Sequence, residues 1–211
     1  VAQWFEQEAA CDRVCVVPNA VLPDMPSESN NKVVSNYSKA SRKLIIAVGT
    51  KAHQKGFDLL IEAFSRIADR FPEWDLALLG LEENRSDGGL SGADIAAAIQ
   101  AANLRHRVYL PGRVGNVCDW YEAADIFVLS SRFEGFPNVL IEAMAHGCAV
   151  LSTDCETGPR GIIRNGCDGM LIPTHDAKAL EGGLECLMSD DNLRARLSHA
   201  APAVRERYSE D

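Results

Sequence analysis

The chain has 211 residues, of which 46% are hydrophobic and 24% charged, a composition typical of one well-buried globular domain. Its formal net charge is −9 and it contains no basic run, which argues against nucleic acid or an anionic membrane surface as a partner. No apolar run approaches the ~20 residues of a membrane-spanning helix, so we expect no direct membrane contact from this segment.

Seven cysteines are scattered along the chain, an odd number, and no two of them form a CxxC pair. We therefore expect reduced thiols in a cytoplasmic protein, and no zinc site. The sequence starts in mid-pattern without an initiator Met, and for this reason we expect it to be one domain of a longer protein.

Residues 1–42 are expected to be a remnant of an upstream domain followed by a linker. Residues 1–10 are amphipathic and predict the end of a helix, and residues 13–17 predict a short strand. Residues 23–41 are rich in Ser, Asn, Pro and Lys, a composition that favours a surface linker.

From residue 43 to residue 211 apolar strands alternate with helical patterns, and we assign this part to one domain. Strands are predicted at residues 43–48, 74–79, 107–110, 125–129, 149–152 and 169–172. Helices are predicted at residues 57–70, 93–102, 117–124, 137–147, 177–188 and 191–207, with a helical turn at 161–164 and polar loops at 49–56 and 81–92. This alternation predicts an α/β fold, a doubly wound, Rossmann-like parallel sheet with helices on both faces.

In such a sheet, ligands bind beyond the carboxyl ends of the strands. Polar residues follow several of these ends: Lys51 and Lys55 after the first strand, Arg113 after the third, Glu134 after the fourth, and Gly158-Pro159-Arg160 after the fifth. We therefore expect their side chains to gather along one edge of the sheet.

The helix predicted from Pro137 has an unusual start. Proline suits a first helical turn, but the preceding Phe136 offers no side-chain oxygen as a cap, and Gly135 lets the backbone approach another group closely. The amides of residues 138–140 are therefore expected to lack partners, and a helix start of this kind can bind an anion. Water is the alternative partner for these amides.

Two glutamates bracket this helix start, Glu134 in the loop and Glu142 about a turn and a half into the helix. Both would repel an anion that touched them, but carboxylates accept hydrogen bonds from hydroxyls, of which a sugar nucleotide has many. The alternative for either residue alone is a solvated surface glutamate.

The run Glu134-Gly135-Phe136-Pro137-Asn138-Val139-Leu140-Ile141-Glu142 resembles the signature of the retaining glycosyltransferases of family 4, which have the two-domain GT-B fold. That signature is a pair of glutamates eight positions apart, with Gly-Phe-Pro or similar after the first. The resemblance extends from about residue 14 to the end and is to the C-terminal half only. It implies that Glu134 holds hydroxyls of the donor sugar, that Glu142 holds the ribose, and that the amides of residues 136–140 lie near the sugar and diphosphate.

The resemblance also implies that Lys55, before Gly56, holds the donor phosphate, which makes Lys55 and Glu134 the candidate catalytic residues. Arg113 and Val114 lie where the family commonly holds the nucleotide base. The full set of candidate nucleotide-sugar-binding residues is Gly49, Lys51, Lys55, Arg113, Val114, Glu134, Gly135, Phe136, Pro137, Asn138, Val139 and Glu142.

Two positions depart from the family pattern. Thr50 follows Gly49 where an arginine is common, so either Lys51 or Arg113 is left to supply the second phosphate cation. Glu82 stands where a second glycine often follows Gly80, so we expect a rearranged loop there. Asp154, in the loop after the fifth strand, could approach the sugar.

We therefore expect the donor-binding domain of a glycosyltransferase that moves a sugar from a nucleotide-diphosphate sugar, UDP-linked by resemblance, to a glycan or lipid-linked acceptor held by a missing N-terminal domain. That domain would place the enzyme peripherally at the inner membrane, and the segment alone should transfer little sugar. No cofactor and no metal are expected, since there is no Asp-x-Asp motif. Two alternatives stay open: a non-catalytic nucleotide-sugar-binding module, and a GT-B sugar-nucleotide epimerase, which the spacing of Glu134 and Glu142 disfavours.

Overall fold

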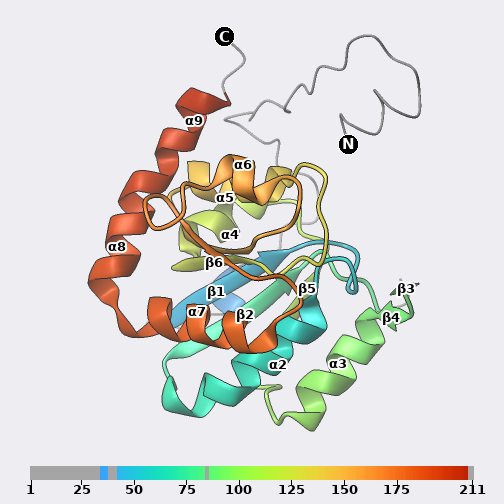
Figure 1. The fold of residues 1–211 in the computed structure, drawn as a ribbon. Coiled ribbons are helices and arrows are strands. Elements are labelled where there is room, and N and C mark those ends of the chain that lie inside the picture. Colours follow the sequence, from blue (N-terminus) through green and yellow to red (C-terminus); the bar gives the residue numbers. More distant parts are fainter. Residues whose placement is uncertain (1–33, 38–41, 84–85, 209–211) are drawn as a thin grey trace, which may run out of the picture.

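The computed structural model describes residues 34–37, 42–83 and 86–208 (Figure 1). The predicted helix end at 1–10, the predicted strand at 13–17 and most of the predicted linker lie outside these residues. Within the linker, Val34–Asn36 forms a short 3-10 helix, η1.

Six parallel strands form the central sheet (Figure 1): β1 Lys43–Val48, β2 Trp74–Leu79, β5 Val108–Gly112, β6 Ile126–Leu129, β7 Ala149–Thr153 and β8 Met170–Ile172. Their order across the sheet is β5-β2-β1-β6-β7-β8, and all neighbouring pairs are parallel. Ile45 in the middle of β1 pairs with Leu76 on one side and with Ile126 on the other. The predicted doubly wound sheet is confirmed, with strand ends within two residues of the predicted ones.

Helices connect the strands: α2 Phe57–Ile67 with the 3-10 turn η2 Ala68–Arg70, α3 Gly92–Ala101, α4 Val117–Ala123, α5 Asn138–Ala145, α6 Pro159–Ile162 and α7 Ala177–Ser189. The predicted helix at 191–207 is three pieces: α8 Asp191–Ala200, the 3-10 turn η3 Ala201–Ala203 and α9 Val204–Arg207. The break coincides with Pro202, which has no N–H to donate. No helix in the described part of the chain is both long and apolar enough to span a membrane.

The sheet is buried on both faces. Alternate β-strand residues, such as Ile45 and Leu76, pack against α2, α3 and α7, whereas their neighbours Ile46 and Ala77 pack against α4, α5 and the C-terminal helices. In Figure 1 these two helical layers lie below and above the sheet. Burial on both faces explains why the strands read as continuous apolar runs rather than as alternating ones.

The predicted loop at 81–92 differs from expectation. It contains a small antiparallel hairpin, β3 Ser86–Asp87 and β4 Leu90–Ser91, joined through Gly88 and Gly89. The backbone of Gly88 lies so close to the ring of His53 that an added Cβ would be 2.7 Å from its Nδ1. The segment after β2 thus rests on the loop after β1, and whether Glu82 rearranges this loop relative to the family stays a prediction.

Candidate functional site

The strand order reverses between β1 and β6. Strands β1, β2 and β5 follow one another toward one side of the sheet, and β6, β7 and β8 toward the other. The loops leaving the carboxyl ends of β1 and β6 therefore diverge and leave a crevice, the usual ligand position in open α/β sheets. Lys55 comes from the first of these loops and Glu134 from the second.

An ion pair joins the two loops. Lys55 Nζ lies 2.7 Å from Glu134 Oε1, and the two side chains are only 14% and 6% exposed. Ser131 also donates its hydroxyl to Glu134 Oε1 at 2.6 Å. The structure thus brings together the two residues that the sequence singled out as catalytic.

Lys55 is held by close packing of the two loops. The Ser130 hydroxyl donates to the Lys55 carbonyl at 2.8 Å. Gly56 has φ of 62°, and a Cβ there would lie 2.1 Å from the Ser130 carbonyl oxygen. A Cβ on Gly49 would lie 2.5 Å from Lys55 Cγ. The lysine stem therefore lies directly over the end of β1. A side chain at position 56 would clash with backbone, whereas one at position 49 would displace the Lys55 side chain.

Glu134 is fixed at its backbone as well as at its carboxylate. The Thr157 hydroxyl, from the loop after β7, donates to the Glu134 carbonyl, and Gly158 in that loop packs against Gly135 and Pro137. Only Oε1 of Glu134 is engaged by described residues. The Oε2 atom keeps its lone pairs for a hydroxyl placed in the crevice.

The start of α5 agrees only in part with expectation. The helix begins at Asn138, one residue after the predicted start at Pro137, and no side chain caps it, as predicted. The expectation of three free amides is wrong for two of them, because Asn138 donates to Phe136 O at 3.1 Å and Leu140 to Pro137 O at 2.9 Å. Among described residues, the amides of Gly135, Phe136 and Val139 have no hydrogen-bond partner. The free donors thus lie partly before the helix, next to Glu134.

Glu142 is half-buried in α5 and accepts a hydrogen bond from the Tyr121 hydroxyl at 2.9 Å. Burial, reinforced by the charge of Glu142, raises the pKa of Tyr121 well above its usual value. The phenol therefore keeps its proton and remains a donor over the physiological range. Its hydrogen bond leaves Glu142 Oε1 available to another donor.

The two candidates for a second cation are both exposed. Lys51 has no side-chain partner among the described residues. Arg113 and Val114 follow β5, which is separated from β6 by β2 and β1. Gly112, just before Arg113, accepts a hydrogen bond from the Gly80 amide at 2.8 Å, and Gly80 packs against Gly49 beside Lys55. Which cation acts stays a prediction.

Three residues that contact the candidate site were not among the predicted ones: Ser131, Thr157 and Tyr121. Ser131 stands two residues after a predicted strand, so its place in the sequence could have identified it. Tyr121 gave no such signal, because its contact with Glu142 arises only when α4 and α5 pack together. Among the described residues, no group of three or more His, Cys, Asp or Glu could hold a metal ion.

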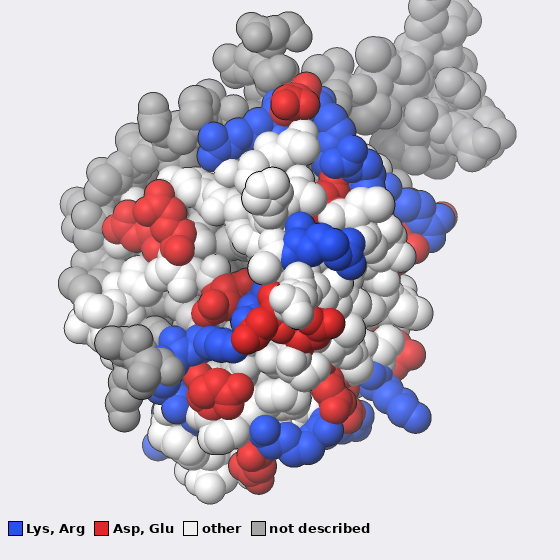
Figure 2. Space-filling view, turned by 90° about the vertical axis from the view of Figure 1, so that its left-hand side faces the viewer, with Lys and Arg blue, Asp and Glu red and all other residues white. Residues whose placement is uncertain are grey.

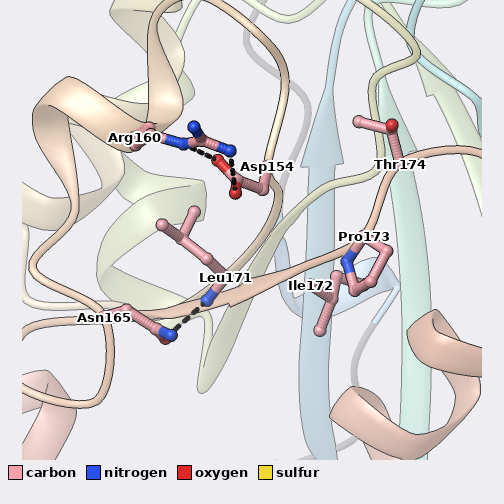
Figure 3. Close-up of a pocket in the computed structure, with 7 residues that line it drawn as sticks. All are labelled: Asp154, Arg160, Asn165, Leu171, Ile172, Pro173 and Thr174. Carbon is pink, nitrogen blue, oxygen red and sulfur yellow. Dashed lines mark hydrogen bonds and ion pairs between the residues drawn. The ribbon is translucent and has the colours of Figure 1, made fainter.

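A pocket of about 410 Å³ opens beyond the carboxyl ends of β7 and β8 (Figure 3). Asp154 and Arg160 line one side, paired through Nε at 2.9 Å and Nη2 at 2.6 Å, and Pro173 and Thr174 line another. The hydrogen bonds from Arg160 hold the pKa of Asp154 below its usual value. Asp154 therefore belongs to this pocket and is paired within it.

The face of the molecule shown in Figure 2 carries lysine and arginine side chains interspersed with aspartate and glutamate. No extended patch of one sign appears among the described residues of that face. A mixed surface of this kind gives no electrostatic attraction to a polyanion.

A family model described as "Glycosyl transferases group 1" matches residues 29–204. The chain belongs to this family. The match includes every strand of the six-stranded sheet and both loops of the crevice. The resemblance drawn from the glutamate motif is therefore confirmed at the level of the family.

Curated relatives bear related names. An "Uncharacterized glycosyltransferase" of Haemophilus influenzae is 27% identical over 191 residues, covering 90% of this chain and 49% of the relative. A Campylobacter jejuni protein, "N-acetylgalactosamine-N,N'-diacetylbacillosaminyl-diphospho-undecaprenol 4-alpha-N-acetylgalactosaminyltransferase", is 33% identical over 159 residues, covering 75% of this chain and 41% of that protein. The chain spans half or less of the length of these relatives.

Solved structures agree on the fold. The C-terminal domain of a glycosyl transferase group 1 family protein from Francisella tularensis matches with a TM-score of 0.70 and 25% identity, covering 82% of this chain and 90% of that domain. S. aureus TarM, crystallised with UDP among its ligands, matches with a TM-score of 0.77 and 21% identity over 99% of this chain and 40% of TarM. The expected GT-B C-terminal domain is thus confirmed as a fold.

Proposed function

We propose that this chain is the donor-binding domain of a retaining glycosyltransferase that transfers a sugar from a UDP-sugar to a glycan or lipid-linked acceptor. The observation that carries the proposal is the buried Lys55–Glu134 ion pair, 2.7 Å long, at the point where the strand order reverses. A cation and a carboxylate held side by side can serve the diphosphate and the sugar of one donor.

Lys55 supplies the charge that the reaction needs. When the bond to the sugar breaks, negative charge grows on the departing phosphate oxygen, and a positioned ammonium group stabilises it. The amides of Gly135, Phe136 and Val139, which have no partner in the described part of the chain, add neutral donors at the positive end of α5. With these groups present, neither a metal ion nor a cofactor is required by the proposal.

Glu134 and Glu142 are assigned to hydroxyls. Glu134 Oε2 would accept from the donor sugar while Lys55 and Ser131 hold Oε1. Glu142, fixed by Tyr121, would accept from the ribose. In the proposed front-face reaction the leaving phosphate helps to deprotonate the acceptor, so that no carboxylate nucleophile is needed.

UDP is the proposed nucleotide because neighbours in fold were crystallised with it: S. aureus TarM, and Anabaena HepE in complex with UDP and glucose. The acceptor class is proposed from relatives such as the Campylobacter jejuni enzyme, whose name specifies a diphospho-undecaprenol-linked saccharide. A second domain would bind this acceptor, and a cytoplasmic, membrane-peripheral location would suit it.

Calorimetric titration of the chain with UDP, GDP and ADP, without added metal, tests the proposal. We expect UDP alone to bind, with its affinity lowered about tenfold or more in Lys55→Ala, since a lost charge-assisted hydrogen bond is worth ~1.5–3 kcal/mol. Glu142→Ala should weaken binding as well. Lys178→Ala, which removes an exposed lysine on α7, is the control and should bind as the unchanged chain does. Absence of binding by all three nucleotides would refute the proposal.

A further inference from the structure

The pocket beyond β7 and β8 is distinct from the crevice between β1 and β6. Its volume of about 410 Å³ falls within the ~300–1,000 Å³ of small-molecule sites. Leu171 and Pro173 give it apolar surface, and Asp154, Arg160, Asn165 and Thr174 surround that surface with polar groups (Figure 3). We propose that this pocket binds an uncharged sugar ring of the acceptor.

The polar groups retain the hydrogen-bonding capacity that such a ring needs. Arg160 uses Nε and Nη2 on Asp154, and its Nη1 has no partner among the described residues. Asn165 accepts from the Leu171 amide at 2.9 Å through Oδ1, which leaves its NH₂ group free. The Thr174 hydroxyl has no partner in the described part of the chain either. Donors and acceptors thus surround an apolar floor, complementary to the hydroxyls and the C–H face of a saccharide.

The charges of the pocket favour a neutral ligand. Arg160 is neutralised by Asp154 through two hydrogen bonds, so a phosphate or carboxylate would have to break this pair and would meet the Asp154 charge. A hydroxyl can donate to a remaining lone pair of Asp154 without breaking it. None of the described residues that line the pocket is aromatic, so none could stack with a nucleobase.

The pocket is close enough to the crevice to hold an acceptor. Asp154 is three residues before Thr157, whose hydroxyl binds the Glu134 carbonyl. Because a chain extends at most ~3.6 Å per residue, Asp154 lies within roughly 11 Å of Thr157. One loop therefore borders both sites. The acceptor role rests on the proposed function, whereas the prediction of saccharide binding does not.

Nitrogen-15 NMR of the 211-residue chain, saturated with UDP and titrated with the methyl α-glycosides of glucose and N-acetylglucosamine, tests the inference. We expect amide shifts around Asp154 and residues 171–174 with UDP still bound. Asp154→Asn should weaken glycoside binding about tenfold, the value of a hydrogen bond to a charged group, and Thr174→Val should weaken it less. Neither change should alter UDP affinity. Glu185→Gln, which breaks the exposed bidentate pair with Arg70, is the matched control and should change neither.

The outcomes are distinct. Absence of glycoside shifts at the pocket, or unchanged glycoside affinity in Asp154→Asn and Thr174→Val, would overturn the inference. Displacement of UDP by the glycosides would place them in the donor crevice and overturn it too, as would binding of inorganic phosphate in their place. Glycoside binding in a chain that ignores UDP would refute the proposed function and leave the pocket as a saccharide site without an acceptor role.

Discussion

Buried carboxylates lie at both edges of the central sheet, but they differ in how many of their oxygens accept hydrogen bonds. At the amino edge, Asp75 is fully buried at the start of β2 and receives both Nε and Nη2 of Arg42, at 2.7 and 2.5 Å. Arg107, just before β5, approaches the same carboxylate at 3.3 Å and donates to the carbonyls of Trp74, Ala68 and Phe71. Both oxygens of Asp75 are therefore engaged.

At the carboxyl edge, the Glu134 side chain is almost as buried as that of Asp75, yet described residues engage only one of its oxygens. Nearby amides at the start of α5 also lack partners among the described residues. Asp75, with both oxygens engaged, stabilises the fold. Glu134, with one oxygen engaged by described residues, remains available to a ligand. The number of carboxylate oxygens that accept hydrogen bonds, and not the burial of the side chain, therefore distinguishes the structural carboxylate from the ligand-binding one.

The largest expected effect comes from removing the carboxylate of Asp75 at the amino edge. Asp75→Ala would leave Arg42 and Arg107 without their counter-ion, and removing one partner of a buried pair costs about 3 kcal/mol or more of unfolding free energy. Urea unfolding would measure this. Glu185→Ala, which removes the partner of the exposed Arg70, is the control and should cost far less, because solvent screens exposed ion pairs. Equal losses would show that the amino-edge network contributes no more to stability than an exposed ion pair.

Measurements at alkaline pH test the burial of Cys148, which precedes β7 at the amino edge of the sheet. Burial, and then the charge of Asp125, raises the pKa of this thiol from 9.0 to about 12. A raised pKa means that the folded chain holds the proton more tightly than the unfolded chain. The contribution of the protonated Cys148 thiol to the unfolding free energy is therefore fully present below pH 9.0 and is lost as the pH rises toward 12.

Unfolding free energy should accordingly fall more steeply above pH 9.0 in the unchanged chain than in Cys148→Ala, by at most ~1.4 kcal/mol per pH unit. Urea titrations at several pH values would give the slopes. Cys186→Ala, at an exposed cysteine, should keep the slope of the unchanged chain. Identical slopes in all three proteins would contradict the burial argument.

Local pattern sufficed to predict the strands and most helices, because a strand buried on both faces is apolar throughout and α2 repeats its apolar residues with helical spacing. It could not predict the hairpin at Ser86–Ser91, which has only two residues in each strand. Nor could it show that the Leu140 amide donates to Pro137 O, since hydrogen bonds between residues so near in sequence depend on the conformation of the local turn.

The site was predicted in the same uneven way. Lys55 and Glu134 were singled out by the resemblance to family 4, and the rule that parallel strands end at one edge of the sheet predicted their proximity. Their direct contact, and the hydroxyls of Ser131 and Thr157 around them, depend on how closely two loops approach each other. Tyr121 reaches Glu142 across a helix–helix contact that no spacing within the sequence encodes.

A variant that displaces Lys55 without removing it tests whether the position of its ammonium group determines UDP affinity. In Gly49→Ala the new Cβ would lie 2.5 Å from Lys55 Cγ, so the flexible lysine must move away from Glu134. We expect UDP affinity to fall about tenfold, equivalent to ~1.4 kcal/mol, in calorimetric titration. Gly182→Ala, where the Cβ meets open space in α7, should keep full affinity and gain roughly 0.5–1 kcal/mol of stability. Equal UDP affinity in both variants would separate Lys55 from the nucleotide.

The smallest expected effect separates the hydrogen bonds of two tyrosines, Tyr121 at the carboxyl edge and Tyr109 at the amino edge. Tyr121→Phe removes the donor that fixes Glu142, but Glu142 is only half-buried, so water can replace the hydroxyl. We expect UDP affinity to fall about threefold and unfolding free energy by ~1 kcal/mol or less. Tyr109→Phe is the matched control, because its hydroxyl serves His106 O at 3.2 Å and Asp75 at 3.4 Å. It should leave UDP affinity unchanged. A larger loss of UDP affinity in Tyr109→Phe than in Tyr121→Phe would mean that the amino-edge network also positions the ligand, and the division between the two edges would fail.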